Sequence, residues 1–244
     1  MSITSIENLL AELGLSGALE SFRTFSGDPQ KLSSTTMEVL LETILINERN
    51  MRESRRQEVM LRLAHLPLPA VESAVSYDEE RGQLFKEHML RALTLDFVDK
   101  GQNINIFGRA GSGKSYIATV LARKNCMRGN TTAYYSASDL VNDLKLVYGA
   151  PAYKAKLRTA INRSLLVLDD FCLTSFDNDG QAILFDLLDK RYGKRSTIIV
   201  SQKTPDLWLE VLGHSSLAES IIERASTNNF VITLKGDSRR KSLE

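Results

Sequence analysis

The chain has 244 residues, of which 43% are hydrophobic and 25% charged; this is ordinary globular usage and excludes a disordered or fibrous class. Its 31 Lys and Arg residues balance 30 Asp and Glu residues, so any nucleic-acid surface has to come from local clustering of charge. The sequence has no run of 18 apolar residues, no secretory leader, and no metal-binding spacing at Cys126 or Cys172. We expect a cytoplasmic protein, without membrane contact, that is built from one standard domain and one small domain.

The first part of the chain predicts a small all-helical domain. Apolar residues at helical spacing predict a helix over residues 6–13, which Gly14 ends. Thr35 and Glu38 have the spacing of a capping box, and an apolar face follows them on a long second helix. That helix ends before the two prolines of residues 66–69, where we place the boundary between domains 1–70 and 71–244.

The second domain alternates strands with helices, a pattern typical of a parallel sheet with crossover helices. Short apolar runs predict strands over residues 104–107, 132–136, 165–168, 197–201 and 230–234. Helical spacing predicts helices over residues 113–128, 138–147, 151–162, 179–192 and 216–225. We therefore predict an α/β fold with a five-stranded parallel sheet and flanking helices, preceded by the helical domain.

A glycine-rich P-loop lies between the first predicted strand and the helix after it. Its residues are Gly108, Arg109, Ala110, Gly111, Ser112, Gly113, Lys114 and Ser115. Such a loop wraps phosphates with its backbone N–H groups and with the N-terminus of the following helix. Lys114 would neutralise the β- and γ-phosphate oxygens, and Ser115 would place its hydroxyl on Mg²⁺. We predict ATP and Mg²⁺ at this site, with the neighbouring Tyr116 among the nucleotide contacts.

Two acids, Asp169 and Asp170, end the third predicted strand after four apolar residues. Nucleotide hydrolysis needs a carboxylate near the magnesium, and the tip of a neighbouring strand is the usual place for it. Asp169 would hold Mg²⁺, and Asp170 would orient or deprotonate the attacking water. The pair predicts an ATPase that releases ADP and phosphate.

Together these motifs resemble the IstB helper ATPases of bacterial insertion sequences, which are AAA+ proteins related to the helicase loader DnaC and the initiator DnaA. The resemblance runs over nearly the whole chain. It rests on the P-loop and on residues 64–67, 103–108, 165–171, 184–192, 196–202, 222–224 and 236–240. It implies an AAA+ ATPase core.

The resemblance also implies roles for residues in the last part of the chain. Gln202 stands where the family has Ser-Asn, a polar sensor of the γ-phosphate or the attacking water. Arg224 matches an arginine that reaches the γ-phosphate of the adjacent subunit, so the resemblance implies a homo-oligomer with an arginine finger in trans. Arg240 matches the arginine of the family's Ser-Tyr-Arg, a sensor in cis; Arg239 replaces the tyrosine, and either arginine could serve.

Three basic clusters are candidates for contacts to double-stranded DNA. They are Arg49, Arg52, Arg55 and Arg56; Lys145, Lys154, Lys156, Arg158 and Arg163; and Lys235, Arg239, Arg240 and Lys241. By charge alone each cluster is more ordinarily a solvated surface. The resemblance favours Lys154, Lys156 and Arg158, because the helix after the second strand lines the channel of the assembled relatives. Arg52 and Arg56 are the next candidates.

The resemblance predicts a transposition helper that assembles on DNA with ATP and recruits or activates a cognate transposase. A helicase loader or replication-initiation ATPase shares the same core and is the nearest alternative. A P-loop kinase for a small molecule would need an acceptor pocket, for which no motif is evident. A module that uses ATP as a clamp and barely hydrolyses it also stays open.

Overall fold

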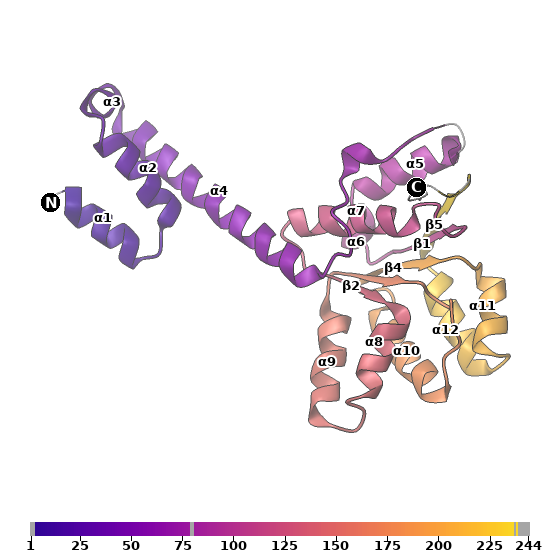
Figure 1. Cartoon of the computed structure of the whole chain (residues 1–244). Coiled ribbons are helices and arrows are strands. Elements are labelled where there is room, and N and C mark those ends of the chain that lie inside the picture. Colours follow the sequence, from indigo (N-terminus) through magenta and orange to yellow (C-terminus); the bar gives the residue numbers. More distant parts are fainter. Residues whose placement is uncertain (1–2, 79–80, 237, 239–244) are drawn as a thin grey trace, which may run out of the picture. The chain divides into compact units, whose positions relative to one another are not determined.

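The computed structural model describes residues 3–78, 81–236 and 238, and the chain divides into two compact units, residues 1–59 and 60–244. The small unit is helical (Figure 1). Its helices are α1 (Ile3–Glu12), α2 (Ser16–Ser26), α3 (Pro29–Ser34) and most of α4 (Met37–Ala64), whose last residues belong to the large unit. The two units therefore part within α4, whereas the functional division at residue 70 stays a prediction.

The small unit confirms the first predicted helix and the long second one, but its capping differs from the prediction. The residue that caps the long helix is Thr36, one residue after the expected Thr35, because the N–H of Val39 donates to Oγ1 of Thr36 at 3.4 Å. The Thr35 hydroxyl donates instead to the carbonyl of Lys31, so the capping box of Thr35 and Glu38 is wrong. Helices α2 and α3 were not predicted; Asp28 caps α3, whose first residue is Pro29.

A buried carboxylate joins α2 to α4 inside the small unit. Glu48 is 8% exposed, and its Oε2 accepts the N–H groups of Gly17 and Ala18 at 2.8 and 3.1 Å. Asn47 donates its amide to the carbonyl of Gly17 at 2.9 Å. A Cβ at Gly17 would lie 2.7 Å from the Asn47 carbonyl oxygen, so only glycine allows this approach. The negative charge of Glu48 stabilises the N-terminal turn of α2.

The large unit is built on a five-stranded sheet with the order β2-β3-β4-β1-β5, in which all neighbours are parallel. The strands are β1 (Asn103–Gly108), β2 (Thr132–Ser136), β3 (Leu165–Asp169), β4 (Ser196–Ser201) and β5 (Asn229–Leu234). All five lie where the sequence predicted them, and the predicted fold class is confirmed.

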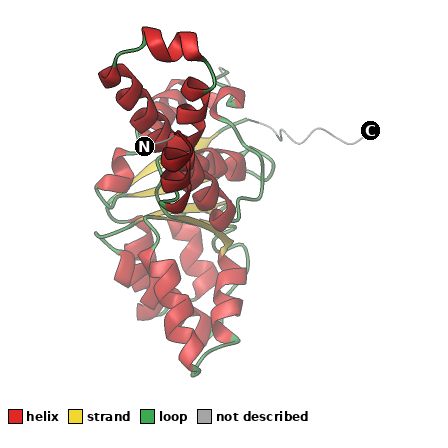
Figure 2. Ribbon diagram, turned by 90° about the vertical axis from the view of Figure 1, so that its left-hand side faces the viewer, coloured by secondary structure: helices red, strands yellow, loops and turns green. Residues whose placement is uncertain are grey.

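Helices cover both faces of this sheet (Figures 1 and 2). One face carries α5 (Gln83–Leu93), α6 (Asp96–Asp99) and α7 (Lys114–Met127), and a 3-10 turn, η1 (Glu72–Ala74), precedes them. The other face carries α8 (Ala137–Lys145), α9 (Pro151–Asn162), α10 (Asn178–Arg191), α11 (Pro205–Leu212) and α12 (Ser216–Ser226). Each layer buries its own apolar cluster against the sheet, as expected for strands covered on both sides.

The strand order gathers the predicted site at one edge of the sheet. The P-loop follows β1, the acids end β3, and Gln202 follows β4, which pairs with both of those strands. Because all the strands are parallel, their carboxyl ends meet at the same edge, where open α/β sheets bind ligands. Among the described residues no helix is both long and apolar enough to cross a membrane.

Candidate nucleotide-binding site

The P-loop connects β1 to α7, and its conformation favours glycine at positions 108 and 113. A Cβ at Gly108 would lie 2.7 Å from both the Leu234 carbonyl oxygen and the Ser112 hydroxyl. Gly113 stands before the first turn of α7 with a φ of 96°, in the left-handed region. Lys114 is 6% exposed, and its Nζ donates to the Arg109 carbonyl at 2.8 Å. The loop therefore offers backbone N–H groups, a helix N-terminus and a held ammonium group to an anion.

A cavity of about 500 Å³ opens beside this loop. Eight of the predicted site residues line it: Ala110, Gly111, Gly113, Lys114, Ser115, Tyr116, Asp170 and Gln202. Gly108, Arg109, Ser112 and Asp169 are not among its lining residues, although they shape the loop and the strand end beside it. A volume of this size is typical of small-molecule and cofactor sites.

The outer wall of the cavity was missed by the sequence reasoning. Leu68, Ala74, Val75, Ser76 and Arg81 line it, and they come from the segment before α5. This segment has neither helical nor strand periodicity, so only its apolar composition after the two prolines could have drawn attention to it. The wall is largely apolar and lies next to the phosphate loop, which suits it to a nucleotide base.

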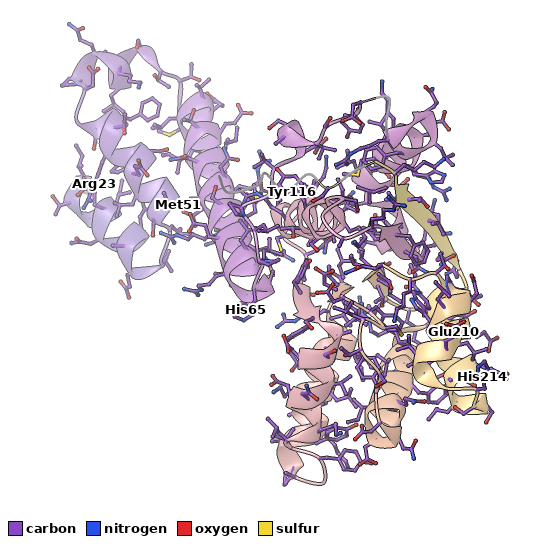
Figure 3. The ribbon with its side chains drawn as sticks, turned by 45° about the vertical axis from the view of Figure 1, so that its right-hand side comes forward. Arg23, Met51, His65, Tyr116, Glu210 and His214 are labelled. Atoms are coloured by element: carbon purple, nitrogen blue, oxygen red, sulfur yellow. The ribbon has the colours of Figure 1, made fainter. Side chains whose placement is uncertain are left out.

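Tyr116 attaches that wall to α7. Its hydroxyl accepts the N–H of Val71 at 3.1 Å and donates to the Val71 carbonyl at 3.2 Å. Nζ of Lys124, further along α7, lies 2.6 Å from a carboxylate oxygen of Glu72. Figure 3 labels Tyr116 on the ribbon of α7. Tyr116 therefore shapes the cavity as well as lining it.

Asp169 ends β3 as a buried carboxylate with two hydrogen bonds. It is 8% exposed; its Oδ1 accepts the N–H of Asp170 at 2.9 Å, and its Oδ2 accepts the Tyr134 hydroxyl at 2.5 Å. Burial, followed by the charge of Asp169, raises the pKa of Tyr134 well above its usual value, which keeps the phenol protonated as a donor.

Asp170 is exposed and lines the cavity, with its backbone in an unusual conformation. Its φ is 52°, in the left-handed region that aspartate tolerates better than most residues. Immediately after it, the N–H of Phe171 donates to the Val200 carbonyl on β4 at 2.9 Å. The chain thus turns sharply at Asp170, and the turn presents this carboxylate to the cavity.

The chemistry of these residues fits a magnesium nucleotide. Mg²⁺ prefers oxygen ligands, usually one or two from the protein together with phosphate oxygens and water. Ser115 offers a hydroxyl at the start of α7, and Asp169 offers a carboxylate at the end of β3.

Among the described residues, Arg224, which was predicted to complete the site of an adjacent subunit, does not line this cavity. Arg224, on α12, places its Nε 2.8 Å from Oδ1 of Asp189 and its guanidinium over the ring of Phe185. Its Nη1 lies 3.1 Å from Oε2 of the adjacent Glu223. The pKa of Arg224 is raised, first by the hydrogen bond to Asp189. Arg239 and Arg240 lie outside the described residues.

The candidate DNA contacts differ in their surroundings. Lys154 and Arg158 are exposed on α9, one helical turn apart. Lys156 lies 2.7 Å from the Asp143 carboxylate. Arg52 donates to Glu48 at 2.6 Å, so it belongs to the polar contact that holds α2. Arg56 lies one turn beyond Arg52 on α4.

The fold and the cavity define a P-loop nucleotide-binding protein with an AAA+ core. More specifically, the chain belongs to the family of IstB-like ATP-binding proteins, whose family model matches residues 8–244. It is 32% identical over 235 residues to the insertion-sequence ATP-binding protein y4pL of Sinorhizobium fredii, covering 96% of this chain and 94% of that protein. It is 28% identical to the ATP-binding protein of insertion sequence IS5376 from Geobacillus stearothermophilus, covering 78% and 75% of the two chains.

Solved structures share the fold at lower sequence identity. DnaI aligns with a TM-score of 0.60 at 20% identity, over 76% of this chain and all of that chain. The replication initiator DnaA, bound to AMPPCP and single-stranded DNA, aligns with a TM-score of 0.60 at 19% identity, over 71% and 52% of the two chains. These likenesses and the family match confirm the resemblance to the IstB and DnaA group that the motifs indicated.

Proposed function

We propose that this chain is an ATPase that assembles on double-stranded DNA in the presence of ATP and assists transposition by recruiting or activating a transposase. The observation that carries the proposal is the place of Arg224: among the described residues the cavity joins the P-loop to Asp170 and Gln202, whereas Arg224 lies on α12 and does not line it. An arginine supplied by a neighbouring subunit would complete it, and hydrolysis would then depend on assembly.

Each residue has a defined task in this proposal. The P-loop amides and Lys114 hold the phosphates, and the apolar wall takes the base. Ser115 and Asp169 would hold Mg²⁺, which supplies positive charge to the phosphate oxygens when bound. Asp170 accepts a proton from the attacking water, Gln202 orients that water, and Arg224 of the adjacent subunit neutralises charge on the γ-phosphate.

The contact between Arg224 and Asp189 bears on how the finger works. A guanidinium held by the carboxylates of Asp189 and Glu223 and stacked on Phe185 is oriented on the surface of α12, with its side chain 27% exposed. An oriented arginine loses less conformational entropy when it meets a phosphate than a mobile one does. Asp189 would therefore keep the Arg224 guanidinium oriented for the γ-phosphate bound by an adjacent subunit.

Mixing two inactive variants tests the trans arrangement. Arg224→Ala keeps its own acids but lacks the finger, whereas Asp170→Asn keeps the finger but lacks the base. Each variant alone should lose at least about 100-fold in DNA-stimulated ATP hydrolysis, since each lacks one catalytic group. Mixed in equal amounts they should recover a substantial part of the wild-type rate, because some interfaces join an intact base to an intact finger.

The control is a mixture of Arg224→Ala with Lys114→Ala, Asp170→Asn. The doubly substituted partner still supplies the finger, so recovery should also occur; omitting duplex DNA should abolish it in both mixtures. No recovery in any mixture, with a monomer in gel filtration on DNA and a nonhydrolysable ATP analogue, would contradict the proposal. Phosphate transfer to a small acceptor without DNA would favour the kinase instead.

A helicase loader remains the second candidate, because the fold also aligns with the DnaC helicase loader, with a TM-score of 0.53 over 67% of this chain and 95% of that chain. The two roles differ in their partner. A pull-down that offers both a cognate transposase and a replicative helicase should retain the transposase only; retention of the helicase alone would reverse the assignment.

A further inference from the structure

The side chain of Tyr134 reaches from the middle of β2 to the acid at the end of β3. The two strands are paired so that Tyr134 lies opposite Val167 and Ser136 lies opposite Asp169. The phenol therefore leans along the strands by two residues, and its hydroxyl donates to Oδ2 of Asp169 at 2.5 Å. Both side chains are 8% exposed. A hydrogen bond from a buried hydroxyl to a carboxylate is of the strong, charge-assisted kind.

The ring of Tyr134 packs in the apolar cluster on the α7 face of the sheet. Ser115, the other residue assigned to magnesium, lies in the first turn of α7, and Thr119 donates to its carbonyl at 2.7 Å. The phenol therefore joins the Asp169 carboxylate to the core on the face of the sheet that carries α7.

These contacts fix the orientation of the Asp169 carboxylate and still leave it able to accept a further ligand. Oδ1 of Asp169 accepts the N–H of Asp170, and Oδ2 accepts Tyr134. Each carboxylate oxygen has two lone pairs, so one lone pair on each oxygen stays available to a cation or a water. Two donors from different elements hold the plane of the group. Partners of this kind typically change metal affinity or activity by 10- to 100-fold when they are removed.

We propose that Tyr134 is a positioning residue that holds the Asp169 carboxylate in the geometry required for Mg²⁺; this rests on the magnesium site of the proposed function. The ring and the hydroxyl have separable tasks. The ring fills space in the core and would do so with any chemistry at the site. The hydroxyl supplies the side-chain hydrogen bond from β2 to Asp169.

Tyr134→Phe separates those tasks, since it keeps the ring and removes the oxygen. The measurement is the Kd of a fluorescent, nonhydrolysable ATP analogue, determined once in EDTA and once in saturating Mg²⁺. We expect an unchanged Kd in EDTA and a Kd about 10-fold weaker in Mg²⁺. Binding requires neither hydrolysis nor DNA, so this result is independent of whether the chain proves to be a DNA-stimulated ATPase.

Tyr135→Phe is the matched control. Tyr135 is the next residue on β2, its side chain packs with the opposite apolar cluster, and removal of its hydroxyl should leave both Kd values unchanged. Asp169→Asn should weaken binding in Mg²⁺ by itself. Adding Tyr134→Phe to it should weaken binding no further, because the tyrosine acts through the carboxylate.

Several results would overturn the proposal. One is equal weakening of both Kd values by Tyr134→Phe, which would indicate damage to the pocket in general. Another is a lowered Tm with both Kd values unchanged, which would make the hydroxyl purely structural. The third is full additivity with Asp169→Asn, or a wild-type Kd that is the same in EDTA and in Mg²⁺.

Discussion

The two units of this chain are held together by different interactions. In the large unit, two apolar clusters cover the two faces of a parallel sheet, and their central residues are fully buried. In the small unit the buried residues between positions 3 and 59 are Gly17, Ala18, Ser21, Phe25, Ile44 and Glu48. A small domain buries a smaller share of its surface than a large one, so individual polar contacts carry more of its stability.

The comparison explains why apolar patterning means different things in the two units. Apolar runs in the large unit became buried strands. The apolar face predicted at the start of α4 is buried only at Ile44, whereas Met37, Leu41 and Leu45 are at least half exposed. In the small unit, the packing of α4 against α2 depends more on the buried Glu48 carboxylate than on that apolar face.

The largest expected effect lies in the large unit, at a buried arginine within its apolar core. Arg191 is 1% exposed, and its Nη1 donates to the carbonyls of Ala160, Ile161 and Arg163, each at 2.8 Å. Arg191→Met keeps an unbranched apolar stem but removes the guanidinium, which leaves these buried acceptors without their donor. The free energy of unfolding of the large unit should fall by about 4 kcal/mol.

Urea unfolding followed by Trp208 fluorescence measures that loss, because this fully buried tryptophan, the sole one in the chain, belongs to the large unit. Arg195→Met is the control, since Arg195 is exposed four residues away and should change stability little. A change below about 1 kcal/mol in Arg191→Met would mean that the carbonyls find other partners, and the contrast between the units would weaken.

The corresponding test in the small unit is Glu48→Gln. The substitution keeps the shape but removes the charge that accepts the N–H groups of Gly17 and Ala18 and the guanidinium of Arg52. Hydrogen bonds to charged groups contribute more than neutral ones, so the small unit should lose about 2 kcal/mol. Hydrogen exchange of the α2 amides should accelerate about 30-fold, while Trp208 unfolding stays unchanged.

The pH dependence of the same contact provides a second measurement. Burial tends to raise the pKa of Glu48, but the hydrogen bonds from Ala18, Arg52 and Gly17 outweigh it and lower the pKa below the ordinary 4.5. The charged carboxylate therefore stabilises the folded unit above pH 4.5, and this stability is lost as the pH falls through the lowered value. Glu48→Gln should remove this acid sensitivity of α2, whereas Glu53→Gln, on an exposed pair, should keep it.

The difference between apolar packing in the large unit and polar contacts in the small one also explains which parts of the structure the sequence predicted. All five strands, the P-loop and the acids were predictable, because a buried parallel strand is a continuous apolar run and phosphate binding demands glycines at fixed spacing. The apolar wall of the cavity was not predictable, since residues 68–76 carry no periodicity and depend on Tyr116 for their position. Helix α2 depends on Glu48, a contact about 30 residues away that no local pattern records.

Asn105 gives the smallest and most discriminating test, because it is a polar residue inside the apolar unit. It lies in the middle of β1, is fully buried, and neither polar atom of its side chain has a hydrogen-bond partner in the part of the chain that the structure describes. Burial of an amide without partners costs free energy, so Asn105→Leu should raise the stability of the large unit by about 1 kcal/mol, measured by Trp208 in urea.

Asn103 is the matched control for Asn105, since it lies two residues away on the same strand and therefore on the same face of the sheet. Its amide accepts the N–H of Thr197 at 2.9 Å and donates to the carbonyl of Arg224 at 3.3 Å. Asn103→Leu should therefore destabilise the unit by about 2 kcal/mol, opposite in sign to Asn105→Leu. If both substitutions destabilise the large unit, the Asn105 amide has hydrogen-bond partners in solution. Polar contacts would then stabilise the core of the large unit as they do that of the small one.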